Sequence, residues 1–177
     1  MKSGASTALA RRAHPDATDQ ATAETVELSP PHAPREESIK SFKELEHELK
    51  AQLVHFRHYH DKHEKEYFQA AVSNSHRRAG RPANLSDHEL AGFSLENLEE
   101  VRVGESSYGY HLFGRLRIPA LPADGPSYVF FRAFDTGKES EAKFHSFHTE
   151  QAEDKVNGGF KFRAIFTKDD PLEWFNE

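Results

Sequence analysis

The spacing of the apolar residues changes from a helical period to a strand period along the chain. In the first stretch they recur every three or four positions, with Lys and Glu between them: Phe42, Leu45, Leu49, Leu53, Phe56 and Tyr67. That spacing is typical of a helix with one buried face. In the second stretch, 108–166, they recur at every second position, which is typical of half-buried strands. The sequence therefore predicts one long helix followed by a sheet.

The predicted helix begins at Ser38 or Ser41 and ends near Val72. Ser41, followed three residues later by Glu44, has the form of a capping box at a helix start. No Pro or Gly interrupts the pattern before Gly80. A helix of this kind gains most of its stability by packing its apolar stripe, and the sheet supplies the surface for it.

Four strands are predicted after the helix, at about 108–118, 128–134, 143–149 and 159–166. The loop Pro119–Pro126 contains Asp124-Gly125 and is too short for a crossover helix, so the first two strands are antiparallel neighbours. A turn at Asn157-Gly158-Gly159 separates the last two. The predicted fold class is α+β, with one long N-terminal helix packed on a four- or five-stranded antiparallel sheet.

The aromatic residues define where the core begins. All of them, 14 Phe, 5 Tyr and 1 Trp, lie at or after Phe42. Residues 1–37 have little large apolar surface to bury, so we expect a disordered tail before a domain at 38–177. The first 16 residues contain no apolar h-region. This favours a cytoplasmic or nuclear protein over a secreted one, with an organelle transit peptide as the alternative.

Composition excludes several classes of function. The chain has no cysteine, which rules out disulfides, thiolate-bound zinc and a thiol nucleophile in this sequence. Its 29 acidic against 23 basic residues argue against a nucleic-acid partner, and the basic cluster His76–Arg81 is interpreted as a solvated loop. No apolar run approaches the roughly 20 residues that span a bilayer. We therefore expect no cofactor, no nucleic acid and no membrane among the partners.

Two segments resemble conserved elements of the cystatin-like superfamily. Leu53–Asp61 reads Leu-Val-His-Phe-Arg-His-Tyr-His-Asp, a loose counterpart of the Leu-Ala-Arg-Phe-Ala-Val-x-x-His-Asn helix segment of plant cystatins. Plant cystatin-like domains without inhibitory loops share Tyr59 and His63. Glu105–Gly109 lies where the family has Gln-x-Val-x-Gly, and it keeps the glycine. The chain resembles this superfamily over about residues 42–175.

The resemblance implies a binding wedge made of an N-terminal strand and two hairpin loops. The candidate protein-binding residues are those of the two loops: Glu105, Ser106, Ser107, Tyr108, Gly109, Asp135, Thr136 and Gly137. The two serines replace the apolar middle of the first loop, and the Pro-Trp of the second loop has no counterpart at Asp135–Ser140. We therefore expect a non-enzymatic protein-interaction domain, with inhibition of a papain-like cysteine protease as one form of that role.

Aromatic residues on both faces of the predicted sheet indicate a second surface that a protein partner would bind. Phe130-Phe131 and the pair Phe144 and Phe147 alternate in direction along their strands. An apolar face left uncovered by the helix would suit a protein partner. Edge strands that pair between copies would give a homodimer.

An acid–base enzyme is the alternative function, because a cone of helix and sheet also occurs in dehydratases and isomerases related to nuclear transport factor two. His111 with Asp135, or His148 with Glu150, would supply the acid and the base. These pairs are hypotheses that depend on geometry.

Histidines of the predicted helix have the spacing of metal ligands, in two pairs: His55 with His58, and His60 with His63. A third ligand, His145 or His148, would have to face the helix from a distant strand. We interpret the helix histidines as polar residues beside the apolar stripe and predict no metal site.

Overall fold

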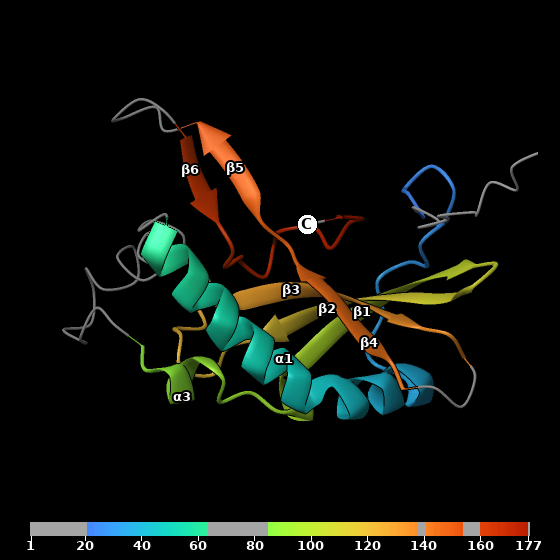
Figure 1. Cartoon of the computed structure of the whole chain (residues 1–177), viewed down its shortest axis with the longest axis horizontal. Helices are drawn as coiled ribbons and strands as arrows, with labels where there is room; N and C mark the ends of the chain where they lie inside the picture. The colour runs from blue at the N-terminus through green and yellow to red at the C-terminus, as the bar shows by residue number, and fades with distance from the viewer. Residues whose placement is uncertain (1–20, 64–84, 138–140, 154–159, 177) are drawn as a thin grey trace, which may run out of the picture.

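The main helix, α1 (Glu36–His63), packs on one face of a four-stranded antiparallel sheet (Figure 1). The structure is a computed structural model, and it describes residues 21–63, 85–137, 141–153 and 160–176. The α+β class predicted from the sequence, one main helix with an antiparallel sheet, is confirmed. Within the described residues, no helix combines the length and the apolar character that a bilayer crossing requires.

The sheet follows chain order, and each neighbour is antiparallel. Its strands are β1 (Leu98–Ser106), β2 (Gly109–Arg117), β3 (Tyr128–Asp135) and β4 (Lys143–Phe147). A separate two-stranded ribbon consists of β5 (Glu150–Glu153) and β6 (Phe160–Arg163). A short helix α3 (Asp87–Leu90) and a 3-10 turn η1 (Leu95–Asn97) lead into β1. The predicted strands near 108–118, 128–134 and 143–149 correspond to β2, β3 and β4, and the one near 159–166 contains β6, which belongs to the ribbon and not to the main sheet. Strands β1 and β5 were not predicted. The predicted turn at Asn157–Gly159 lies outside the described residues.

The predicted capping box at Ser41 and Glu44 is wrong, because α1 begins earlier, at Glu36. The Ser41 hydroxyl donates to the Glu37 carbonyl oxygen (3.1 Å) and to Asp135 Oδ2 (2.9 Å). The Glu44 carboxylate accepts the backbone N–H of Ala142 at 3.1 Å. Both side chains therefore tie the helix to the loop between β3 and β4. The predicted helix end near Val72 lies outside the described residues.

The principal core lies between α1 and the sheet. The apolar stripe of the helix, Phe42, Leu45, Leu49 and Leu53, is fully buried against residues of β2 and β3, including Leu112, Leu116, Val129 and Phe131. Each such side chain contributes roughly 1.5–3 kcal/mol by leaving water. Gly114 in β2 leaves room for the Phe131 ring, since a Cβ there would lie 2.3 Å from Phe131 Cε1.

A second apolar cluster covers the other face of the sheet. Its buried members are Phe113, Tyr128, Phe130, Phe166, Leu172 and Phe175. The expectation that the sheet would leave an aromatic face uncovered is therefore wrong for Phe130, which is 1% exposed. The C-terminal residues, which carry no regular period, take the place that an external partner was expected to fill.

The predicted boundary of the N-terminal tail is wrong for residues 21–37. Leu28 forms a bridge with Gly104 and His32 forms one with Val101, so this segment lies along β1. Ala21 and Val26 are buried. The segment fits because Gly104 has no side chain: a Cβ there would lie 2.6 Å from Val26 Cγ1. Residues 1–20 lie outside the described residues.

Candidate functional site

A two-residue hairpin joins β1 to β2 at one end of the sheet. Ser106 and Gly109 are the last paired residues, so Ser107 and Tyr108 form the tip. The Ser106 hydroxyl donates to the Gly109 carbonyl oxygen at 3.1 Å and accepts the Tyr108 N–H at 3.4 Å. Gly109 has a φ of 149°, a region that residues with a side chain rarely adopt. The backbone of the hairpin is thus held from within while the Tyr108 ring is 62% exposed.

The loop after β3 lies directly beside this hairpin. Asp135 is the register partner of Tyr110, the second residue of β2. Asp135 Oδ1 accepts the Gly137 N–H at 2.8 Å, and its other oxygen accepts the Ser41 hydroxyl of α1. The Gly137 backbone approaches the Tyr110 ring so closely that a Cβ would lie 3.0 Å from Cε2. The two candidate loops proposed from the sequence therefore meet at one end of the sheet.

The N-terminal segment adds a third element to this end of the sheet. The Ser29 N–H donates to the Val103 carbonyl oxygen at 2.8 Å, and the Ser29 hydroxyl accepts the Val103 N–H at 3.0 Å. We call the combination of Val26–His32, Ser106–Gly109 and Asp135–Gly137 the loop end. The first of these segments was missed in the sequence, where Val26 and Leu28 are the apolar residues of an otherwise polar stretch.

A groove of about 450 Å³ opens beside the hairpin at the loop end. Its walls come from the N-terminal segment, the start of α1 and the adjoining parts of β1 and β2. They carry three carboxylates, Glu27, Glu37 and Glu105, with Arg35 and the 41%-exposed Tyr110. Within the described parts of the chain, none of the three carboxylates forms an ion pair. The loop end therefore combines exposed aromatic rings with a surface of net negative charge.

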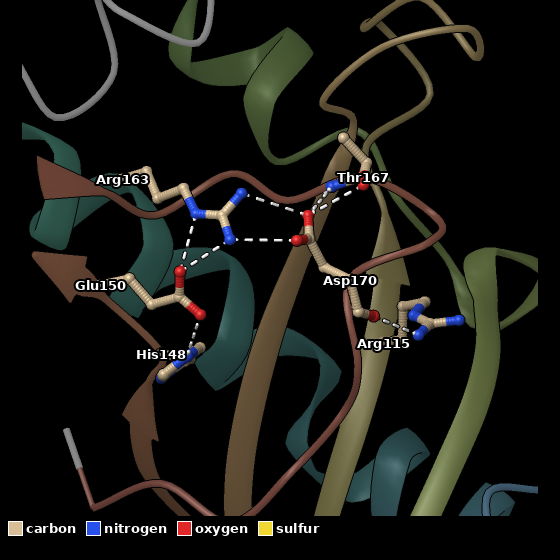
Figure 2. A network of polar contacts seen from close by, with 6 residues as sticks. All are labelled: Arg115, His148, Glu150, Arg163, Thr167 and Asp170. Atoms are coloured by element: carbon tan, nitrogen blue, oxygen red, sulfur yellow. Dashed lines mark hydrogen bonds and ion pairs between the residues drawn. The ribbon is translucent and has the colours of Figure 1, made fainter. Parts of the chain in front are cut away.

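A polar network lies at the junction of β5, β6 and the C-terminal residues (Figure 2). His148 Nε2 lies 3.3 Å from Glu150 Oε1. The second Glu150 oxygen accepts from Arg163 Nε at 2.8 Å and from Nη2 at 2.7 Å. Arg163 Nη2 also donates to Asp170 Oδ1 at 3.0 Å. The structure thus brings His148 and Glu150 together, as one of the two acid–base hypotheses required.

The ionisation of this network follows from its hydrogen bonds. Burial by itself would raise the pKa of Asp170, but the N–H and hydroxyl of Thr167, together with Arg163, outweigh it and lower that pKa below its ordinary value. Burial would likewise lower the pKa of Arg163, and the carboxylates of Glu150 and Asp170 reverse the sign and raise it. Asp170 is therefore a carboxylate and Arg163 a cation over the ordinary pH range.

The environment of His148 shows what this network does. Its ring stacks on Phe166 at 5.1 Å and on Phe175 at 4.6 Å between centroids. Both oxygens of Glu150 already have partners in His148 and Arg163. The network therefore joins β5, β6 and the C-terminal residues to one another.

The other acid–base hypothesis, His111 with Asp135, is wrong. His111 Nδ1 lies 3.2 Å from Arg132 Nη2, and the His111 ring contacts Trp174 on the face away from α1. The Asp135 carboxylate instead contacts Ser41 of α1. Because successive side chains of a strand alternate between its faces, and His111 is paired with Phe134, the two groups point to opposite sides of the sheet.

Of the paired helix histidines, His55 and His58 have described side chains; both are exposed, and His58 has a structural partner. His58 Nε2 lies 2.7 Å from Asp87 Oδ2, which links α1 to α3. The side chains of His60 and His63 lie outside the described residues. His145 is exposed and its Nδ1 lies 2.8 Å from the hydroxyl of Ser146. In the described part of the chain, no three His, Asp or Glu residues are grouped so as to hold a metal ion.

Comparison of the chain with models of protein families, with curated proteins and with solved structures gives no match. The functional assignment therefore depends on the geometry of the loop end.

Proposed function

We propose that this chain is a non-enzymatic protein-interaction domain that binds its partner with the loop end. The observation that carries the proposal is Tyr108, a large and mostly exposed ring at the tip of a hairpin. Hydrogen bonds of the Ser106 hydroxyl hold the backbone of that hairpin. Tyrosine is enriched among residues that dominate binding energy, because its ring buries much area and orders few torsions. A tip that is rigid before binding loses little conformational entropy when it binds.

The arrangement of the loop end supports a cystatin-like wedge as the form of this interaction. An N-terminal segment, the hairpin Ser106–Gly109 and the loop Asp135–Gly137 lie side by side, which is what the resemblance to cystatins implies. A papain-like cysteine protease is therefore the first partner to test. The polar Ser106 and Ser107 and the acidic Glu105 offer little apolar area to a protease cleft, and they favour a partner with polar or basic contacts.

Inhibition of papain by the full chain is the direct test, run beside Tyr108→Asp. Tyr59→Asp is a matched control, because Tyr59 is 55% exposed and lies on α1, about 27 Å along the helix axis from Ser41. A wedge predicts inhibition by the wild type, at least tenfold weaker inhibition by Tyr108→Asp and no change in Tyr59→Asp. Equal inhibition by all three proteins would remove the loop end from the mechanism.

Absence of papain inhibition would leave the wider proposal, which has its own test. Two variants of the full chain carry a photo-crosslinking amino acid, one at position 108 and one at position 59. The proteins that crosslink to each position are then compared. The proposal predicts a partner specific to position 108, whose purified form then binds Tyr108→Asp at least tenfold more weakly than the wild type. Identical captures from the two positions would contradict it.

The enzyme alternative has one observation in its favour, the contact between His148 and Glu150. Against it, the second carboxylate oxygen of Glu150 is held by Arg163 and the imidazole is stacked on two phenylalanine rings. A general acid or base needs to reach a substrate proton within hydrogen-bond distance. These contacts support a structural role for the pair, in line with a non-enzymatic domain.

A further inference from the structure

The last described residues, Asp170–Asn176, cross the sheet on the face away from α1 without joining it as a strand. We call these residues the C-terminal strap and that face the outer face. The last backbone bonds between this part of the chain and the sheet are those of Phe166 with Ser127 and Tyr128, at 2.7 to 3.0 Å. Beyond Phe166, the described bonds between strap and sheet come from side chains.

Three arginines of the outer face bind backbone carbonyls of the strap. Arg115 Nη2 donates to the Asp170 carbonyl oxygen at 2.7 Å, and Arg102 Nη1 donates to that of Leu172 at 2.9 Å. Arg132 Nη1 donates to the Phe175 carbonyl oxygen at 3.2 Å. The arginines stand on three adjacent strands: Arg102 of β1 and Arg132 of β3 both lie opposite Phe113, and Arg115 lies two residues farther along β2. Recognition of carbonyl groups in this way suits an extended peptide.

Side chains of the strap fill apolar positions of the same surface. Leu172 is 2% exposed and Phe175 is 6% exposed. The Trp174 ring lies 5.1 Å from that of Phe113, and the Arg132 guanidinium lies 4.5 Å from the Trp174 ring centroid. Donors to the backbone combined with seats for apolar side chains are the elements of a peptide-binding surface, and here the ligand is the strap of the same chain.

Among the described residues, every hydrogen bond that holds the strap to the sheet involves a side chain, so release breaks these bonds and the apolar contacts. The strap begins at Asp170, whose carboxylate bonds to Arg163 and Thr167 in a turn (Figure 2). No strand ladder has to open, so release costs less than opening the sheet. The tethered strap competes at an effective concentration on the order of millimolar, which favours the closed monomer at low protein concentration.

We propose that the outer face binds the C-terminal strap of a second copy of this chain when its own strap is released. Every copy carries both the face and the strap, so two copies that exchange straps form a closed, two-fold dimer. The occupant is known to fit, because the same residues make the same bonds within one copy. This interaction is independent of the loop end and goes beyond its proposed role.

Two full-length variants test the exchange by complementation. The first has a disabled face, Arg115→Met with Arg132→Met, and keeps its strap. The second has a disabled strap, Leu172→Ser with Trp174→Ala, and keeps its face. Neither variant can form both halves of an exchanged dimer, but the strap of the first can bind the face of the second.

The expected result is monomers in each variant alone and a complex of twice the 20.1 kDa chain mass in the equimolar mixture. Half of the chains in the mixture should be in the complex at about 100 µM, which corresponds to a weak but specific contact. Sedimentation equilibrium measures this fraction. The sole tryptophan of the mixture is Trp174 of the first variant, so its emission should also move to shorter wavelength on mixing.

A mixture that stays monomeric at that concentration would overturn the proposal, as would equal dimerisation of each variant alone, which indicates another surface. Circular dichroism first establishes that both variants are folded. Should Leu172→Ser unfold the chain, Trp174→Ala alone replaces it, and a synthetic peptide with the sequence of residues 169–177 serves as the probe. That peptide should bind the Trp174→Ala chain at least tenfold more tightly than the wild type, whose face is occupied; equal binding would contradict exchange.

Discussion

Gly109 lies so close to Asp135 that a Cβ at position 109 would stand 2.3 Å from the Asp135 carbonyl oxygen. The hairpin between β1 and β2 and the loop after β3 are therefore packed backbone against backbone. Because Asp135 also bonds to Ser41, the same contact fixes both loops to the start of α1.

Substitution Gly109→Ala should destabilise the fold by roughly 1–3 kcal/mol, because the φ of 149° is strained for alanine and the new methyl group meets backbone atoms. Urea unfolding measures the change as a lower midpoint. Gly125→Ala is the control, since nothing lies within 4 Å of a Cβ there and its φ is ordinary. Equal stability of the two variants would show that the hairpin and the loop are not packed together.

Substitution Gly104→Val should displace the N-terminal segment from β1, because a Cβ at this position meets Val26 Cγ1 at 2.6 Å and Leu28 Cδ2 at 3.0 Å. Hydrogen exchange at the Ser29 and His32 amides, which bond to Val103 and Val101, should become at least tenfold faster. Adding Val26→Ala to Gly104→Val should restore part of the protection. Unchanged exchange in the single variant would contradict the placement of this segment.

The carboxylate of Asp170 should make stability depend on acid pH. Its pKa is lowered in the folded chain, so its contribution is complete above the ordinary value of 3.8 and disappears as the pH falls through the lower folded value. In Asp170→Asn the free energy of unfolding should therefore fall less steeply between pH 5 and pH 2 than in the wild type. Parallel curves in chemical unfolding at a series of pH values would show that the bonds from Thr167 and Arg163 do not form.

The phenol of Tyr128 should make stability depend on alkaline pH. Burial, followed by the hydrogen bond to Glu99 Oε2 at 3.0 Å, raises its pKa above the ordinary value of 10.0. The folded state thus retains this proton longer than the unfolded state, and the contribution is lost as the pH rises from 10 through the folded value. Tyr128→Phe should flatten the loss of stability above pH 10. An identical loss in both proteins would place the phenol in water.

Ser41 and Glu44 of α1 show that contacts with residues distant in sequence can override a local motif. Ser41 and Glu44 have the spacing of a capping box, yet they bond to Asp135 and to the backbone of Ala142. Both partners are remote in sequence and arrive only when β3 and β4 pack beside the helix. A short-range pattern cannot distinguish these two uses of the same side chains.

Strand β1 was missed because its burial does not alternate. Leu98, Val101 and Gly104 are its buried residues, a spacing of three. A register shift between Leu98 and Glu100 breaks the strand period, and Gly104 is buried by Val26 and Leu28 of the N-terminal segment. The reason for the irregular pattern is thus a tertiary contact.

The sequence by itself determined the elements whose period is local: the stripe from Phe42 to Leu53 on the helix, and the alternation along β2 and β3. The candidate loops beside these strands came from the resemblance to cystatins and not from the period of the strands. Only the tertiary structure decided where the segments 21–35 and 170–176 lie. Residues 21–35 and 170–176 have no period of their own and are ordered by what the sheet offers them, the space at Gly104 and the donors of Arg102, Arg115 and Arg132. Those groups come together only after the sheet has formed, and no local pattern in either segment reports them.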